Sequence, residues 1–470
     1  MEVLQRTANR GSISTGYDID NSCKFEPDNS ESMSRTPAGN GNLKTCTLSF
    51  WVKITELNKS HMFFTGDYGG AADPWFVIGL ISDKIYISST AGISGDSVVP
   101  SRLLRDTSAW YHLVFAFDTT QGTAADRIKI YVNGVQETVF TSTTYPSLNE
   151  DLDIMAAKAQ GIAGYNDGTD YRFAGYMSEF VGIDGQALAP TEFGEFDADS
   201  GIWKPIDVSG LTFGTNGFYL DFKDSANLGN DASGGLDFTE TNITAADQAT
   251  DTPTNNFQTF LSDGTLFNTG TDNITYSEGG TKFAKGNSTA WAISYTNIAM
   301  TNGKWYMEFE NPGTGTDTQF GLIPVAFPTS RAYLDTYIGA TTDGTVAYNI
   351  SDGTFNQNGG GSGGVTSVTG DIIGIAVDID NNRAYWHKNG TYMDSSDPVA
   401  GSGGKVLSDE PYFFALATYN PNNNGKTNTG GYTAISISSA ASDANGYGTF
   451  EYAPPTGYYA LCTKNLAEFG

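Results

Sequence analysis

Two similar stretches decide the fold: residues 110–134, WYHLVFAFDTTQGTAADRIKIYVNG, and residues 370–390, GDIIGIAVDIDNNRAYWHKNG. Each runs from a hydrophobic segment through an acidic turn to a second hydrophobic segment and ends in Asn-Gly. Apolar and polar residues alternate with a period of two, which predicts paired β-strands with one face buried and the other in water. Asn133-Gly134 and Asn389-Gly390 are the dipeptide that accepts positive φ at both positions of a tight turn. Two copies far apart in the chain predict two separate β-sandwiches.

The composition agrees with an all-β chain. Among 470 residues there are 56 Gly, 25 Tyr and 28 Phe, and only 17% of residues are charged. This mixture suits many short strands joined by turns. Hydrophobic runs recur at intervals of about ten residues with turn residues between them, as is typical of antiparallel sandwiches and jelly rolls.

The strand rhythm divides the chain into four parts. Residues 1–15 are an N-terminal contact segment, 16–200 a first sandwich, 201–258 a connector and 259–470 a second sandwich. The connector holds one strand-like run, NGFYLDF, and then a polar stretch with too little apolar content for its own core. We expect it to be ordered and to lie on one or both sandwiches, the alternative being a flexible tether. One short helix is expected, over residues 187–196.

Charge and hydropathy exclude several classes of protein. With 25 basic and 53 acidic residues the net charge is −28, which argues against nucleic acid and anionic membranes as partners. No stretch approaches the roughly 20 apolar residues that span a bilayer, and the first residues lack the apolar centre of a signal peptide. We therefore expect synthesis in a cytoplasm without membrane insertion. Cys23, Cys46 and Cys462 are expected to be buried thiols.

At these residues the chain resembles two known families. Residues 20–185 resemble a laminin-G or concanavalin A-like lectin domain, and residues 265–460 resemble a SPRY domain, which is also a concanavalin A-like sandwich. The first resemblance is carried by TLSFWVKI, AWYHLVFAFD, RIKIYVNGVQ and RFAGYMSEFVGIDG. The second is carried by GKWYMEFE, QFGLI, GDIIGIAVDIDNNRAYWHKNG and PYFFALATYN. The resemblance implies two concanavalin A-like antiparallel sandwiches joined by an extended connector.

The order of these modules resembles structural and fibre proteins of tailed bacteriophages. It implies a virion protein (fibre, tail appendage or capsid decoration) that is made in the host cytoplasm and displayed on the particle surface. Its expected partners are other virion proteins and a host-surface glycan or protein. Exposed edge strands and multivalent display favour a homo-oligomer. A cellular SPRY adaptor that binds peptides is a further hypothesis.

The alternative function is a polysaccharide-degrading enzyme, because some glucanases resemble this fold and use two carboxylates on one strand. The nearest match is Glu195-Phe196-Asp197-Ala198-Asp199, which ends in Asp where such an enzyme has Glu. It is expected at a helix end or loop, where an acidic turn is the simpler interpretation. Asp197 and Asp199 are also the calcium candidates, without the distal Glu of a calcium loop. His61, His112 and His387 have no ligand-spaced partners, so we expect neither catalysis nor a resident cofactor.

Loops of both sandwiches supply candidate binding residues. Aromatic rings can stack on sugars while Asp and Asn bind hydroxyls; the simpler interpretation is that these aromatics plug the sandwich rim. The candidate glycan-binding residues are Tyr68, Asp73, Trp75, Tyr165, Asn166, Asp167 and Tyr171. The candidate partner-binding residues of the second sandwich, from loops that suit recognition or simply turns, are Arg331, Tyr333, Tyr337, Tyr419, Asn420 and Tyr432.

Overall fold

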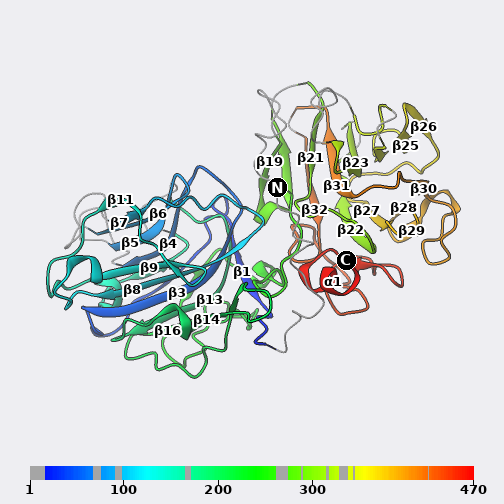
Figure 1. Cartoon of the computed structure of the whole chain (residues 1–470). Coiled ribbons are helices and arrows are strands. Elements are labelled where there is room, and N and C mark those ends of the chain that lie inside the picture. The colour runs from blue at the N-terminus through cyan, green and yellow to red at the C-terminus, as the bar shows by residue number, and fades with distance from the viewer. Residues whose placement is uncertain are drawn as a thin grey trace. The chain divides into compact units, whose positions relative to one another are not determined.

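A computed structural model describes residues 16–66, 76–89, 98–164, 171–260, 274–286, 289–313, 317–327, 337–341, 344–421 and 423–470. Of the described residues, 16–254 form one compact unit and 255–470 form a second. We call them the N-terminal unit and the C-terminal unit. The regular secondary structure of both units is almost entirely β-strand (Figure 1), so the chain is all-β, as predicted.

The N-terminal unit holds two large antiparallel sheets. Sheet A has the order β10-β9-β8-β3-β13-β1-β18, with β16 also on β13, and sheet B has the order β11-β7-β6-β5-β4-β12-β2-β17. The strands of sheet A are β1 (Ser22–Phe25), β3 (Thr45–Ile54), β8 (Trp110–Asp118), β9 (Ile128–Val132), β10 (Val135–Gln136), β13 (Gly175–Asp184), β16 (Phe218–Leu220) and β18 (Gln248–Ala249). The strands of sheet B are β2 (Ser32–Arg35), β4 (Ser60–Gly66), β5 (Phe76–Ile81), β6 (Lys84–Ser89), β7 (Val98–Pro100), β11 (Phe140–Thr143), β12 (Gln160–Ile162) and β17 (Thr239–Thr241).

The C-terminal unit repeats the two-sheet plan. Sheet C has the order β19-β20-β32-β22-β27-β28-β29, with β30 on β28 and β33 on β22, and sheet D has the order β21-β31-β23-β24-β25-β26. The strands of sheet C are β19 (Ile274–Ser277), β20 (Lys282–Lys285), β22 (Lys304–Glu310), β27 (Ile372–Asp378), β28 (Arg383–Lys388), β29 (Thr391–Tyr392), β30 (Lys405–Val406), β32 (Asn424–Asn428) and β33 (Tyr459–Ala460). The strands of sheet D are β21 (Ala292–Tyr295), β23 (Thr318–Pro324), β24 (Val346–Asn349), β25 (Thr354–Gln357), β26 (Gly360–Ser362) and β31 (Tyr412–Thr418).

Alternate residues of the strands fill the core of each unit. On β27, Ile373, Ile375 and Val377 lie in the inter-sheet core, as the period-two pattern predicts. In the part of the chain that is described, the only α-helix is α1 (Thr463–Phe469), and no helix there is long and apolar enough to cross a membrane. The three cysteines are buried thiols.

Both Asn-Gly dipeptides form the predicted tight turns. Asn133 and Gly134 have φ of 49° and 77°, and Asn389 and Gly390 have φ of 48° and 80°. The helix expected over residues 187–196 is wrong. A single 3-10 turn (Pro190–Glu192) is followed after one residue by β14 (Gly194–Phe196), which pairs with β15 (Trp203–Pro205) in a separate hairpin. Proline starts the turn, but the residues after it continue as strand instead of helix.

The prediction that one strand face is in water is confirmed for β9, where buried and partly exposed residues alternate, but it is wrong for β8 and β27. Every residue of β27 is buried, and β8 is buried from His112 to Phe117. In the N-terminal unit the outer face of sheet A packs against residues that follow β13, in the cluster of Val114, Val181, Ile183, Phe193, Val208 and Tyr219. In the C-terminal unit the outer face of sheet C packs against Phe257 and residues that follow β32, in the cluster of Phe257, Tyr306, Ala376, Tyr385, Phe450, Tyr458, Ala460 and Cys462.

Residues 203–254, interpreted in the sequence as most of a connector, lie within the N-terminal unit. Besides β15–β18, this segment contributes carboxylates that meet buried cations of the sandwich. Lys24 Nζ lies 2.9 Å from Asp247 Oδ1, Lys53 Nζ lies 2.7 Å from Asp251 Oδ2, and Arg35 Nη1 lies 3.6 Å from Asp231 Oδ2. Buried charges are stable only when paired. These contacts therefore hold the segment in place together with the apolar side chains that it adds to the core, which are Phe218, Leu220, Phe222, Leu228, Phe238 and Ile243.

Candidate functional site

Three strand ends of sheet D meet at one edge of the C-terminal unit. Strand β21 begins directly after Trp291, β31 ends directly before Tyr419, and β23 begins directly after Asp317. In the ladder, Ala292 and Thr318 both pair with Thr418. The register therefore brings the three flanking residues to the same edge, where β21, β31 and β23 run side by side (Figure 1).

An aromatic group, which we call the aromatic rim, occupies this edge: Trp291, Tyr337 and Tyr419. The Trp291 ring centroid lies 5.5 Å from that of Tyr419 and 5.8 Å from that of Tyr337, with interplanar angles of 48° and 54°. All three residues are half-buried. The indole also packs against the apolar cluster on the outer face of sheet D. The rings are thus held by the fold while part of each residue stays open to solvent.

Polar groups stand beside the aromatic rim. The Tyr419 N–H donates to the Asp317 carbonyl at 2.9 Å, and Asn420 Nδ2 donates to Asp317 Oδ2 at 3.4 Å. Next to Tyr337, the Ile338 N–H donates to Gln319 Oε1 at 2.8 Å. Fixed rings with a neighbouring carboxylate and amide form a surface that can stack on an apolar face of a ligand and bind its hydroxyls.

The structure brings together three of the predicted partner-binding residues, Tyr337, Tyr419 and Asn420. Tyr432 is buried, with its hydroxyl 3.4 Å from Glu278 Oε2, and does not join the aromatic rim. Arg331 and Tyr333 lie outside the described residues. Sequence reasoning missed Trp291 and Asp317. The position of Trp291 at the start of a predicted strand could have indicated a surface aromatic residue. Which residues lie beside it depends on the register of three strands, which the sequence does not show.

Most candidate glycan-binding residues of the N-terminal unit lie outside the described residues: Tyr68, Asp73, Trp75, Tyr165, Asn166 and Asp167. Tyr171 is described and is 44% exposed. Its carbonyl accepts the Met62 N–H at 2.9 Å, which fixes its backbone to the start of β4.

The acidic cluster of the enzymatic alternative is a turn with a lysine across it. Glu195 lies on β14, and Lys204 Nζ bridges it at 3.3 Å and Asp197 at 3.2 Å. Asp197 Oδ1 accepts the Ser200 N–H and hydroxyl, both at 2.9 Å, and the Asp199 N–H at 3.1 Å. These donors, the Ser200 N–H first, lower the pKa of Asp197 to about 2. A general acid needs the opposite shift, since it must carry a proton near neutral pH.

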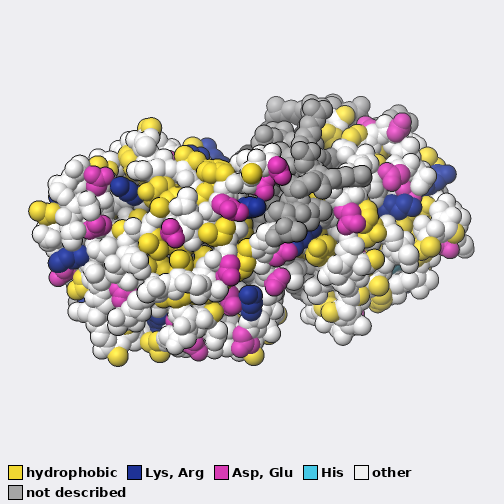
Figure 2. Space-filling view, turned by 60° about the horizontal axis from the view of Figure 1, so that its bottom comes forward, with side chains coloured by type: hydrophobic (Ala, Val, Ile, Leu, Met, Phe, Trp, Pro, Cys, Tyr) yellow, Lys and Arg dark blue, Asp and Glu magenta, His cyan; other side chains and the backbone are white. Residues whose placement is uncertain are grey.

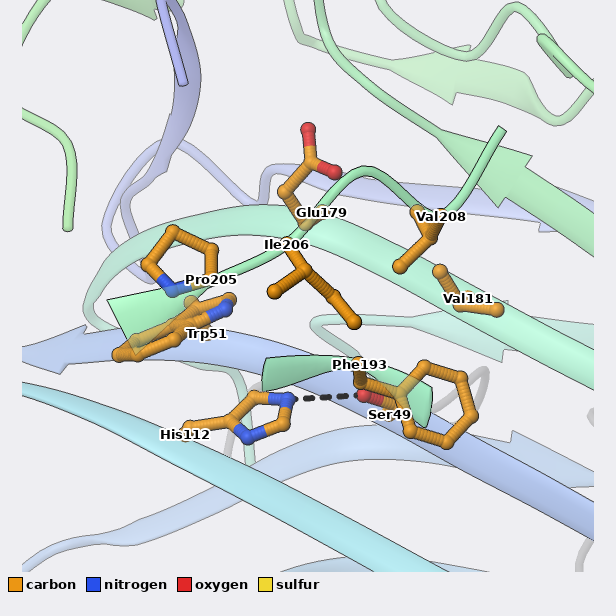
Figure 3. A pocket seen from close by; sticks show the side chains of 9 residues that line it. All are labelled: Ser49, Trp51, His112, Glu179, Val181, Phe193, Pro205, Ile206 and Val208. Carbon is orange, nitrogen blue, oxygen red and sulfur yellow. Dashed lines mark hydrogen bonds between the residues drawn. The ribbon is translucent and has the colours of Figure 1, made fainter. Parts of the chain in front are cut away.

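His112 and Ser49 lie in a pocket on the outer face of sheet A, which Figure 3 shows with the Glu179 carboxyl pointing away from the imidazole. Trp203 Nε1–H donates to His112 Nδ1 at 2.9 Å, so the ring proton must lie on Nε2. Nε2 therefore donates to Ser49 Oγ at 2.9 Å and cannot accept the serine proton. Burial lowers the pKa of His112 to about 3, which keeps the ring neutral. This pair is not an activated nucleophile.

Among the described residues, no group of three or more His, Cys, Asp or Glu side chains lies close enough together to hold a metal ion. At the calcium candidates, the Asp197 carboxylate already accepts hydrogen bonds from Ser200, Asp199 and Lys204.

In the comparison with known proteins, residues 28–192 match a family model, Laminin_G_3, described as the concanavalin A-like lectin/glucanases superfamily. No curated protein matches the chain. Similar solved structures include the SPRY domain of human HERC1, at 19% identity over 33% of this chain and 91% of that one, with a TM-score of 0.25. Another human SPRY domain has 19% identity over 34% and 96%, with a TM-score of 0.26.

A heptameric SAP-like pentraxin from Limulus polyphemus has 15% identity over 37% of this chain and 80% of that one, with a TM-score of 0.29. The family match confirms the concanavalin A-like resemblance of the first sandwich, and SPRY domains are among the similar structures. The fold is compatible with carbohydrate binding.

Proposed function

We propose that the chain is a non-catalytic glycan-binding protein of a tailed-bacteriophage virion, and that the aromatic rim of the C-terminal unit holds the glycan. The observation that carries this proposal is the half-buried group of Trp291, Tyr337 and Tyr419 beside the Asp317–Asn420 contact. The rings would stack on the C–H face of a sugar, and Asp317 and Asn420 would bind its hydroxyls.

A non-catalytic role is supported by the chemistry of two described sites that resemble catalytic groups. The Asp197 carboxylate is held ionised by its donors, and the His112 imidazole is protonated on the nitrogen that faces Ser49. Hydrolysis of host polysaccharides that is abolished by Glu195→Gln would overturn this part of the proposal.

The virion setting is supported by the order of the modules and by the charge. A net charge of −28 favours solubility when many copies are displayed together. On the face shown in Figure 2, Lys and Arg side chains are scattered and form no basic patch. Antibody against this chain should decorate purified virions in electron micrographs; undecorated particles would contradict the virion setting.

The glycan site is tested by a glycan array with the full chain and two variants. Trp291→Ala should weaken binding at least about fivefold, since stacking of a ring contributes on the order of 1–3 kcal/mol. Tyr171→Ala is the matched control, because it removes an exposed ring from the N-terminal unit. Unchanged binding by Trp291→Ala, or a loss with Tyr171→Ala instead, would contradict the proposed site.

A further inference from the structure

Lys24 is a buried lysine held between two buried carboxylates. Its side chain is 1% exposed; Nζ lies 2.8 Å from Glu31 Oε1 and 3.0 Å from Oε2, and 2.9 Å from Asp247 Oδ1. The side chains of Glu31 and Asp247 are 2% and 8% exposed. One ammonium facing two carboxylates in the interior is a costly arrangement, because each ion has lost its water.

The three groups come from both ends of the N-terminal unit. Lys24 lies on β1, and Asp247 directly precedes β18, the last strand of that unit. The two strands pair antiparallel, with Cys23 opposite Gln248. Glu31 lies in the turn between β1 and β2, one residue before β2. Long-range strand pairing therefore fixes the amine against the carboxyl, and no flexible loop has to carry either group.

Each carboxyl is oriented by its own donors. Asp247 Oδ2 accepts the Thr244 N–H at 2.8 Å and the Thr244 hydroxyl at 3.1 Å, while Oδ1 faces the lysine. Glu31 accepts the Glu26 N–H at 2.7 Å and Asn29 Nδ2 at 3.0 Å. Two donors on Oδ2 are placed to stabilise negative charge that develops there, as in an oxyanion hole. Burial raises the pKa of Glu31, which favours a carboxyl able to take up a proton.

We infer that Lys24 and Asp247 join through an amide bond, with Glu31 transferring the protons. Glu31 takes a proton from the Lys24 ammonium, and the free amine attacks Asp247 Cγ. The bond from Cγ to Oδ1 then breaks, and Glu31 passes the protons released by Nζ to Oδ1, which leaves as water. An ammonium and a carboxylate become one amide and one water, so atoms and charges balance without an oxidant or another reactant. Held in contact, the two groups react as an intramolecular pair.

The bond would replace a buried ion pair by a neutral amide and link the first and last strands of the unit. A covalent link between residues 24 and 247 closes nearly the whole N-terminal unit into one loop. Such a link restricts the unfolded chain and therefore stabilises the folded one.

The Lys53–Asp251 pair provides an internal control. Lys53 Nζ lies 2.7 Å from Asp251 Oδ2, and Trp110 Nε1 donates to Asp251 Oδ1 at 2.9 Å. This pair is as buried as Lys24–Asp247, and its carboxylate also accepts an indole N–H. An indole cannot shuttle protons, so we expect this pair to remain an ion pair.

The test is the intact mass of the purified full chain after denaturation, followed by peptide mapping. We expect a mass one water below that of the sequence, and a branched peptide that joins the segments around Lys24 and Asp247. Glu31→Gln should restore the full mass, whereas Asp247→Asn should lose ammonia instead of water. Lys53→Met should leave the water loss unchanged.

A wild-type chain with the full sequence mass would overturn the inference, and so would a branch at Lys53 or one from Lys24 to Glu31. Because the wild-type measurement needs no variant, a folding defect of Glu31→Gln would not obscure the result. Asp247→Asn nearly preserves the shape of the side chain, and it gives a second positive signal, the loss of ammonia.

Discussion

In both units a covering segment, which we call the cover, packs over the outer face of one sheet, but different interactions hold it there. In each unit, chain that follows the main strands packs over the outer face of one sheet, with Phe193 and Val208 on sheet A and Phe450 and Tyr458 on sheet C. In the N-terminal unit, the covering segment ends in residues that form buried ion pairs with Lys24, Arg35 and Lys53.

A buried carboxylate, Glu308, on β22, holds the covering segment of the C-terminal unit on sheet C. It accepts the N–H groups of Glu451 and Tyr452 at 2.9 and 2.8 Å, Asn428 Nδ2 at 3.1 Å and the Tyr306 hydroxyl at 2.9 Å. The N-terminal unit has a comparable carboxyl, Glu179, which accepts two tyrosine hydroxyls instead. The same task, holding a polar segment on an apolar sheet, is thus solved once with charge pairs and once with hydrogen bonds.

The largest effect is expected from Lys53→Met in the N-terminal unit. Removing the ammonium leaves Asp251 buried without its counter-charge, which should cost about 3–5 kcal/mol of the free energy of unfolding. A urea titration with pulse proteolysis of the full chain measures this, because the protected fragments report on each unit separately. Lys53→Met with Asp251→Leu should recover most of the loss.

Lys204→Met is the matched control for that experiment. It breaks contacts to Glu195 and Asp197 on the surface, where ion pairs contribute little. If Lys53→Met were no more destabilising than Lys204→Met, charge pairing would not be what holds the cover of the N-terminal unit.

A second prediction concerns pH. Burial raises the pKa of Glu179 and of Glu308 to about 7, above the ordinary value of 4.5. Folding therefore favours the protonated form, and its stabilising contribution is complete below pH 4.5 and is lost as the pH rises through 7. Each group should account for a decrease on the order of 3 kcal/mol in its own unit. The same urea titration at pH 5 and pH 8 measures this, and a stability that rises with pH would contradict it.

Replacing each glutamate by glutamine should lower the stability of the two units by different amounts. Glu308 accepts N–H groups on both of its oxygens, so the amide group of Glu308→Gln must face a donor in either orientation. At pH 5 this should destabilise the C-terminal unit by about 2 kcal/mol. Glu179→Gln should have a smaller effect, since hydroxyls can rotate and the amide oxygen can replace Oε2. Equal losses in the two variants would show that the two carboxyls are held alike.

The sequence predicted the parts of this fold that depend on local pattern. Strand positions, the inward residues of β27 and the two Asn-Gly turns follow from alternation and turn chemistry. The covered outer faces could not be predicted, because a period of two shows which residues share a face and not what distant chain packs on it. The polar segment before residue 254 looked like a connector, since its order depends on distant parts of the chain. Leu228, Phe238 and Ile243 enter the core of the sandwich, and Asp251 pairs with Lys53, some 200 positions earlier. Tyr337 and Tyr419 of the aromatic rim were predicted from the sequence, but Trp291 was not, because only the register of the strands brings it to the two tyrosines.

The smallest effect is expected at the two Asn-Gly turns, where substitutions test whether the turns stabilise the two units equally. Asn133 Oδ1 accepts the His112 N–H and Asn389 Oδ1 accepts the Ile372 N–H, both at 2.8 Å, while each asparagine has positive φ. Asn133→Ala and Asn389→Ala each remove this hydrogen bond and place an alanine at a positive φ that asparagine tolerates better. Each substitution should lower the free energy of unfolding by about 1–2 kcal/mol. Pulse proteolysis should show each loss in the unit that carries the substitution. A loss in only one of them would mean that one turn is held by its covering segment and not by its own residues.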